Sequence, residues 1–178
     1  MTQQAPDVEL VNAGAGPDPL SLSELAGRDD VDAIVLLFQR DDYCLQCRSQ
    51  VQAANDRYAE FTTRNAWVVS VLPETLDTAR DWVENYDLMF PVLADPDGVA
   101  AEAYDQPTRF GALGEAVDLV GRLPKALILD TREGELEPRY VHEGESTGDR
   151  PSMDELLAQV TEITGNEGVD PEEFQRRA

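Results

Sequence analysis

Residues 31–47 read Val-Asp-Ala-Ile-Val-Leu-Leu-Phe-Gln-Arg-Asp-Asp-Tyr-Cys-Leu-Gln-Cys and carry the strongest structural signal in this chain of 178 residues. The first nine form a short apolar run rich in branched residues, which predicts a central strand buried on both faces. From Cys44 to about Arg64, apolar residues recur at spacings of three and four, which predicts an amphipathic helix. The two cysteines therefore fall where a buried strand gives way to a helix.

Outward from this segment, predicted strands and helices alternate. Apolar runs and turn chemistry predict strands at 66–72, 90–94, 125–130 and 139–143, the last two forming a hairpin around a polar turn. Further helical segments are predicted from the cap Thr75 to Tyr86, at 99–104 and at 152–163. This order is typical of an α/β fold with a mixed central sheet flanked by helices.

The length and apolar content predict one domain, spanning residues 1–164. Residues 165–178 are polar and contain glycine, which predicts a flexible acidic tail. Residues 105–122 carry three glycines and no clean period, so we expect a long irregular excursion with one helical turn around 115–119.

The surface charge is extreme, with 36 acidic against 14 basic residues and a formal net charge of −22. Such a surface repels phosphate backbones and anionic lipid, so nucleic acid and membrane are not expected partners. The acidic residues are spread along the chain and Lys125 is the sole lysine, a composition resembling that of proteins from halophilic microbes. An ordinary acidic protein is the alternative.

The N-terminus shows neither a basic region nor an apolar segment of a secretory signal. The longest apolar run, 33–38, is far too short to span a bilayer. We therefore expect a cytoplasmic protein, in which thiols stay reduced and a close cysteine pair is more often catalytic or metal-binding than structural.

The spacing Cys44-Leu-Gln-Cys47 at a helix N-terminus favours thiol redox chemistry. Unpaired N–H groups and the helix dipole favour an anion there, so a cysteine at this position is a candidate thiolate nucleophile. We expect Cys44 to be exposed and to attack, and Cys47, one turn further, to lie deeper and resolve the mixed disulfide.

Neighbouring residues affect this pair in opposite directions. Residues 41–42, both aspartate, should raise a thiol pKa, while Arg40 and Arg48 should lower it. Tyr43, beside Cys44, is a candidate wall of the reactive pocket.

Other uses of the cysteines have weaker support. Structural zinc needs four Cys or His ligands, and the chain offers only Cys44, Cys47 and His142, so no metal is expected. No glycine-rich phosphate loop or Cys-x-x-Cys-His motif indicates a cofactor. Two inert, buried cysteines in a non-catalytic module are the remaining alternative.

Three further segments strengthen the interpretation. Residues 5–10 (Ala-Pro-Asp-Val-Glu-Leu) with 20–27, 90–98 (Phe-Pro-Val-Leu-Ala-Asp-Pro-Asp-Gly) with Tyr104, and 126–130 (Ala-Leu-Ile-Leu-Asp) stand in the order seen in the alkyl hydroperoxide reductase and thiol-specific antioxidant family. The resemblance covers residues 5–163. It implies a thioredoxin-like fold with an N-terminal extension and an insertion before the strand headed by Pro124.

The same resemblance implies residue roles. Peroxiredoxins of this family carry Pro, Thr and a peroxidatic Cys in one motif and an Arg on a later strand; the matching positions here are Arg40, Cys44, Cys47 and Pro124. Only Cys47 keeps the peroxidase residue type. We therefore expect a dithiol without the hydroxyl and guanidinium partners that polarise a peroxide.

The Cys-x-x-Cys and the later proline instead resemble thioredoxin. In thioredoxins that proline is cis, and a cis Leu123-Pro124 would expose a backbone edge to which an extended substrate can pair. Arg122 would then lie near the cysteines and favour the thiolate.

These observations lead to one main hypothesis and two rivals. The main one is a thiol-disulfide oxidoreductase with an antioxidant role, in which Cys44 attacks and Cys47 resolves, with peroxide or a disulfide as oxidant and a protein or small-molecule thiol as reductant. The rivals are a thiol peroxidase with Cys47 peroxidatic and Cys44 resolving, and a redox-inactive interaction module using residues 105–122. The oligomeric state stays open.

Overall fold

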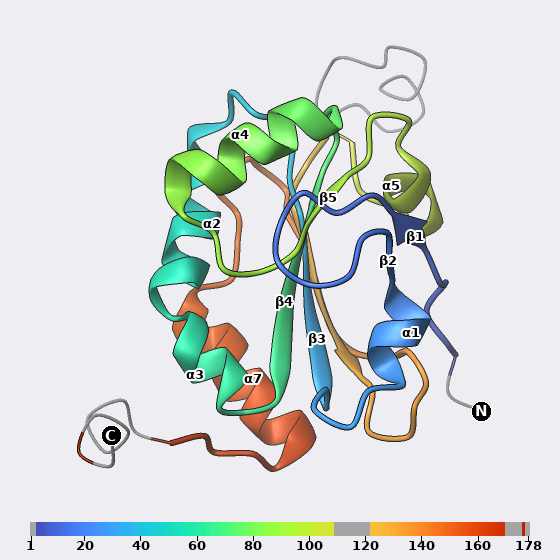
Figure 1. Cartoon of the computed structure of the whole chain (residues 1–178), viewed down its shortest axis with the longest axis vertical. Helices are drawn as coiled ribbons and strands as arrows, with labels where there is room; N and C mark the ends of the chain where they lie inside the picture. The colour runs from blue at the N-terminus through green and yellow to red at the C-terminus, as the bar shows by residue number, and fades with distance from the viewer. Residues whose placement is uncertain (1–2, 109–121, 170–175, 177–178) are drawn as a thin grey trace.

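The central sheet appears in a computed structural model that describes residues 3–108, 122–169 and 176, and within these residues its five strands run in the order β5-β4-β3-β6-β7. β3 (Ala33–Phe38) pairs in parallel with β4 (Ala66–Leu72) and antiparallel with β6 (Lys125–Asp130). β5 (Val92–Ala94) extends the parallel side and β7 (Glu137–Glu143) the antiparallel side. The predicted mixed sheet, with β3 central and fully buried, is confirmed (Figure 1).

Helices cover both faces of the sheet (Figure 1). On one face lie α2 (Leu45–Asp56), α3 (Tyr58–Thr62), α4 (Leu76–Tyr86) and α7 (Met153–Thr164). On the other lie α1 (Leu22–Ala26), α5 (Val99–Ala103) and the N-terminal extension with β1 (Glu9–Leu10) and β2 (Leu20–Ser21).

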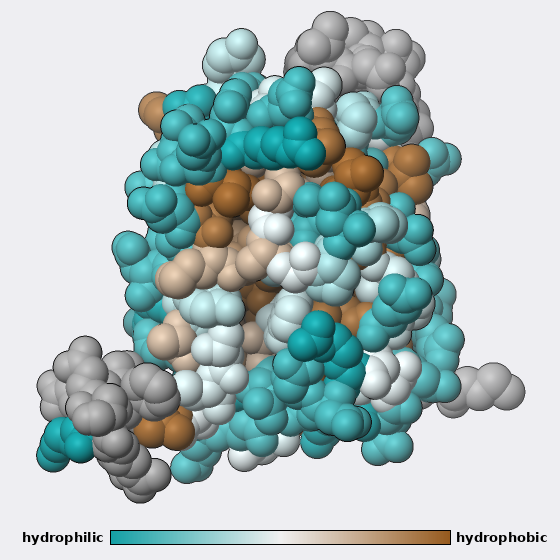
Figure 2. Space-filling view, viewed as in Figure 1, coloured by the Kyte–Doolittle hydropathy of each residue, from teal (hydrophilic) through white to brown (hydrophobic). Residues whose placement is uncertain are grey.

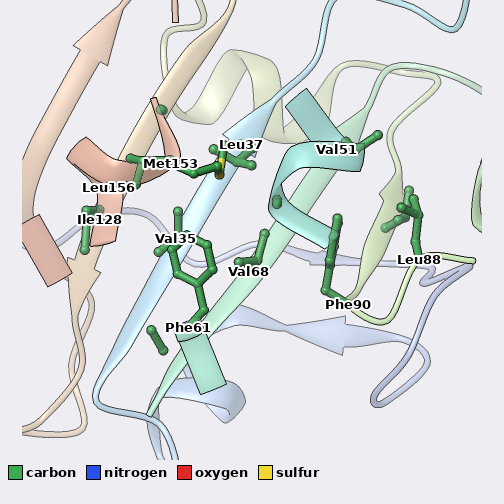
Figure 3. Close-up of a cluster of buried hydrophobic side chains, with 14 of the residues drawn as sticks. Val35, Leu37, Val51, Phe61, Val68, Leu88, Phe90, Ile128, Met153 and Leu156 are labelled. Atoms are coloured by element: carbon green, nitrogen blue, oxygen red, sulfur yellow. The ribbon is translucent and has the colours of Figure 1, made fainter. Parts of the chain in front are cut away.

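Alternation along β3 divides the core into two clusters. Side chains at 33, 35 and 37 pack toward α2 and α7, and those at 34, 36 and 38 pack toward α1 and α5. Figure 3 shows the first cluster, in which Val35 and Leu37 lie with Phe61 and Met153. Burial of each such aliphatic or aromatic side chain contributes about 1.5–3 kcal/mol to the free energy of folding. The end of β3 is therefore firmly packed where the cysteine segment begins.

The helix predicted over 44–64 is wrong in one respect, because the chain breaks at Arg57. There the backbone has φ −110° and ψ 17°, which ends α2 and starts α3. The Arg57 side chain pairs with Glu60 of α3 and Asp154 of α7, and Phe61 becomes fully buried. Tertiary packing thus overrides a continuous helical period.

The other elements match their predicted segments, with shifted ends. Thr75 caps α4, as predicted, by accepting the N–H of Thr78. β5 is shorter than the predicted 90–94, and β7 begins at Glu137 rather than at residue 139. The helical turn predicted at 115–119 lies outside the described residues.

The start of the predicted tail is tied to the domain. Asn166 donates from Nδ2 to Asp32 Oδ2 at 2.8 Å and to the Arg64 carbonyl at 2.9 Å. In Figure 2 hydrophilic side chains surround the edges of the face, in keeping with the high charge, while more apolar side chains gather toward its middle. None of the helices within the described ranges has the length and apolar character to cross a membrane.

Candidate active site

The turn from β3 into α2 sets the two cysteines at different depths. Cys44 is the N-cap of α2, and its Sγ accepts the backbone N–H of Cys47 at 3.1 Å. Both thiols are free; Cys44 keeps 7% of its surface exposed and Cys47 none. The predicted order of depth is confirmed, but the prediction that Cys44 is exposed is wrong: Cys44 is buried, because it packs into the core cluster beneath α2.

The Cys47 sulfur is buried and has two N–H donors. Burial raises the pKa of the Cys47 thiol to about 11, and the positive charge of Arg150 opposes that rise. The backbone N–H of Arg40 also donates to Cys47 Sγ, at 3.3 Å. Cys47 is therefore a protonated thiol near neutral pH, with donors in place for the anion when it forms.

Arg150 connects both sulfurs to a buried polar network. Its Nη2 lies 3.0 Å from Cys47 Sγ and 3.8 Å from Cys44 Sγ. Its Nη1 donates to Gln39 Oε1 at 3.0 Å and to Gln50 Oε1 at 2.7 Å. The planar guanidinium thus faces the sulfurs on one side and two amide oxygens on the other.

Gln39 links Gln50 to Ser70 of β4. Gln39 Nε2 donates to Gln50 Oε1 at 3.1 Å and to Ser70 Oγ at 3.3 Å. Gln39, Gln50 and Ser70 are all buried. Buried polar groups are nearly always hydrogen-bonded, so this network fixes the guanidinium against the sulfurs.

Sequence reasoning missed Arg150 and its network. The available signal was the presence of Gln39 at the end of an apolar strand and Ser70 inside another, since such residues need polar partners. The expectation that the dithiol lacks a guanidinium is wrong. Arg150 supplies one from the loop before α7 instead of from the strand headed by Pro124.

The predicted neighbours in the 40–48 segment do not bring their side chains to the sulfurs. Arg40 Nε pairs with Asp41 Oδ2 at 3.4 Å, and Arg48 Nε donates to the Asp42 carbonyl at 2.7 Å. Tyr43 is 83% exposed, so its ring extends into solvent and forms no pocket wall.

The segment before β6 differs from the thioredoxin expectation. Within the described residues the cis X-Pro bond is Asp18-Pro19, and Leu123-Pro124 is not cis. The Leu123 N–H donates to the Pro107 carbonyl at 2.8 Å, and its carbonyl accepts from Gln106 Nε2 at 3.0 Å. Because both groups have internal partners, Leu123 offers no free backbone edge.

Arg122 is also not placed as predicted. A Cβ at Gly98 would lie 2.6 Å from Arg122 Nη2, which puts this guanidinium at the start of α5. The guanidinium that contacts the cysteines is that of Arg150.

An open groove of about 480 Å³ lies beside the dithiol, between α2 and the loop that enters α7. Gln46, Gln50 and Arg150 are among its lining residues. Across the described residues, no group of three or more His, Cys, Asp or Glu side chains is arranged to hold a metal ion. The chemistry present is thus a free thiol pair with one guanidinium, next to a groove open to solvent.

Comparison with known proteins places this site in a family. A family model described as the AhpC/TSA family matches residues 1–134. The thiol-disulfide oxidoreductase ResA of Oceanobacillus iheyensis is 29% identical over 140 residues, covering 74% of this chain and 69% of ResA. The peroxiredoxin Bcp of Bacillus subtilis is 29% identical over 103 residues, covering 58% of this chain and 62% of Bcp.

Solved structures agree on the fold. The peroxidoxin BcpB of Mycobacterium tuberculosis superimposes with a TM-score of 0.72 at 22% identity, over 91% of this chain and 96% of BcpB. A putative thiol:disulfide interchange protein DsbE of Chlorobium tepidum gives 0.66 at 21% identity, over 94% and 97%. These likenesses confirm the predicted thioredoxin-like fold, and because the family model matches three quarters of its length, the chain belongs to the AhpC/TSA family.

Proposed function

We propose that this protein is a thiol-disulfide oxidoreductase whose Cys44 and Cys47 cycle between a dithiol and a disulfide. The observation that carries the proposal is Arg150 Nη2, which lies 3.0 Å from Cys47 Sγ and 3.8 Å from Cys44 Sγ at the N-terminus of α2. One guanidinium can therefore stabilise negative charge on either sulfur. The name of ResA, a thiol-disulfide oxidoreductase, supports the same chemistry.

The reaction divides the work between the cysteines. Cys44, after losing its proton to solvent, attacks one sulfur of a partner's disulfide; that S–S bond breaks, and the partner's other sulfur leaves as a thiolate and takes a proton. Cys47 then loses its proton and attacks Cys44 Sγ, which releases the partner's second thiolate and closes the Cys44–Cys47 disulfide. The partner is reduced by two electrons, and a protein or small-molecule thiol restores the dithiol.

A second candidate is a thiol peroxidase with Cys47 peroxidatic and Cys44 resolving. It is favoured by the two donors on Cys47 Sγ, the Arg150 guanidinium and the Arg40 N–H. The Cys47 thiolate would attack a peroxide oxygen, form a sulfenic acid and release water or alcohol; Cys44 would then condense with it, releasing water. The complete burial of Cys47 weighs against this candidate.

Stopped-flow reaction of the reduced protein with hydrogen peroxide and, separately, with a protein disulfide tests these candidates. Fast disulfide exchange lost in Cys44→Ser supports the oxidoreductase. Fast peroxide oxidation that survives Cys44→Ser but not Cys47→Ser supports the peroxidase. Ser49→Ala, on the same helix, is the matched control, and slow reaction with both oxidants would leave only the redox-inactive module.

The cytoplasmic location and the adaptation to high salt stay predictions. A reducing compartment fits the proposal, because it supplies the thiols that return the disulfide to the dithiol. Assays at high salt are advisable, since a net charge of −22 repels itself at low ionic strength.

A further inference from the structure

The loop that carries Arg150 is tied to β7 by the single histidine of the chain. His142 Nε2 lies 2.9 Å from Asp149 Oδ1, and Asp149 Oδ2 accepts the backbone N–H of Glu145 at 2.9 Å. The Glu145 N–H and His142 hold the pKa of Asp149 below its usual value. The Asp149 carboxylate therefore joins β7 to the loop: one oxygen contacts His142 of the strand, and the other accepts the N–H of Glu145 in the loop.

The position of Arg150 depends on this loop. Arg150 follows Asp149 directly, and its Nε donates to the Thr147 carbonyl at 2.9 Å. At the other end of the loop, the Gly144 N–H donates to the Pro124 carbonyl at 2.8 Å. A Cβ at Gly144 would lie 2.7 Å from the Asp149 carbonyl oxygen, so the loop closes tightly on itself.

We propose that His142 is a positioning residue: with Asp149 it latches residues 144–150 to β7 and so holds the Arg150 guanidinium on Cys47 Sγ. This rests on the proposed function, because it assigns His142 a part in the same dithiol chemistry. Without the latch the loop gains freedom, and Arg150 spends less time against the sulfur.

The other polar and charged groups near His142 have partners of their own. On the same face of β7, Tyr140 donates its hydroxyl to Glu155 of α7 at 3.0 Å. On β6, the residue paired with His142 is the uncharged Ala126, while Lys125 binds Glu143. Asp149 is thus the ionised group bonded to the imidazole.

A hydrogen bond to an ionised carboxylate is roughly twice as strong as one between neutral groups. The contact from His142 Nε2 to Asp149 Oδ1 is therefore a firm attachment of the loop to β7.

The test is the rate at which dithiothreitol reduces the oxidised protein. A dithiothreitol thiolate attacks Cys44 Sγ, the Cys44–Cys47 bond breaks, and Cys47 leaves with the electron pair as a thiolate facing Arg150; the second dithiothreitol sulfur then displaces Cys44. Dithiothreitol ionises identically in all assays at one pH, so the ratio of wild-type to variant rate isolates the latch.

Three results are expected. His142→Ala slows reduction roughly two- to tenfold, the effect of losing one hydrogen bond. His142→Gln, which keeps a donor for Asp149, stays closer to the wild-type rate than His142→Ala does. Tyr140→Phe, which removes the neighbouring bond to Glu155, is the matched control and leaves the ratio at one.

Arg150→Met supplies the decisive background. If His142 acts through Arg150, adding His142→Ala to Arg150→Met does not slow reduction further. The latch is overturned if His142→Ala slows reduction equally with and without Arg150. It is also overturned if His142→Ala alone reacts at the wild-type rate. A protein that never forms the Cys44–Cys47 disulfide refutes the proposed function instead. The latch is then tested in the Cys44→Ser variant, in which the ultraviolet absorbance of the thiolate reports the pKa of Cys47. Adding His142→Ala should raise that pKa further, and an unchanged pKa overturns the latch.

Discussion

Replacing Arg150 by methionine isolates the contribution of the guanidinium to the dithiol. Methionine keeps an unbranched stem but removes the donors to Cys47 Sγ at 3.0 Å, Gln39 Oε1 at 3.0 Å and Gln50 Oε1 at 2.7 Å. The Cys47 thiolate then loses its strongest partner in a site that is closed to solvent. Every step in which Cys47 leaves or attacks as a thiolate should become slower.

The size of the effect follows from the geometry. A hydrogen bond to a charged group is worth about 1.5–3 kcal/mol. At the transition state of thiol-disulfide exchange, about half of the negative charge has developed on the leaving sulfur. Loss of the bond from Arg150 should therefore raise the activation free energy by about 0.7–1.5 kcal/mol. Reduction of the disulfide form by dithiothreitol should therefore slow roughly three- to tenfold.

The assay is acid quench and alkylation of the oxidised protein at successive times after dithiothreitol is added. Arg57→Met is the matched control: it removes a guanidinium from the same interface of α2 and α7, where Arg57 pairs with Glu60 and Asp154, but no contact with sulfur. A wild-type rate for Arg150→Met, or equal slowing in both variants, would refute the electrostatic role of Arg150.

Other perturbations should give distinct results. Gln50→Leu leaves Gln39 and Arg150 without the oxygen they share, so the free energy of unfolding in urea should fall by about 1–3 kcal/mol; no loss would mean that the network adds no stability. Burial raises the pKa of Cys47 from 9.0 to about 11, so the reduced protein should lose roughly 2–3 kcal/mol of stability as pH rises from about 9 to 11. Urea titrations at both pH values should show a smaller loss in Cys47→Ala, and parallel losses would contradict the assigned cause. Phe61→Ala, at a fully buried position, should cost about 3–5 kcal/mol in the same measurement, and a loss below 1 kcal/mol would argue against the close packing of α3.

Much of the fold follows from local patterns. The apolar run ending at Phe38 and the run at 66–72 become β3 and β4, because a sheet covered on both faces needs strands without polar alternation. The break at Arg57 could not be predicted in this way. It depends on partners in α3 and α7, and a periodic apolar pattern continues through it.

The same distinction between local pattern and tertiary contact applies to the residues of the site. Cys44 and Cys47 lie one turn apart, so their spacing and their place after a strand were enough to find them. Arg150 is separated from Cys47 by 103 positions and reaches it only because a loop returns over the end of β3. The resemblance directed attention to Pro124 and to the neighbouring Arg122, whereas the cation beside Cys47 comes from the loop before α7.

The arrangement also shows where the two proposed oxidants would differ. A guanidinium stabilises a sulfur anion without accepting a proton, so Arg150 assists Cys47 as attacking group and as leaving group alike. Chemistry at the sulfur therefore does not distinguish the two oxidants, and access must. Cys44 keeps 7% of its surface exposed at the first turn of α2, while Cys47 has none. In the two proposed reactions a peroxide must therefore reach the more deeply buried sulfur, whereas a partner's disulfide must reach the less deeply buried one.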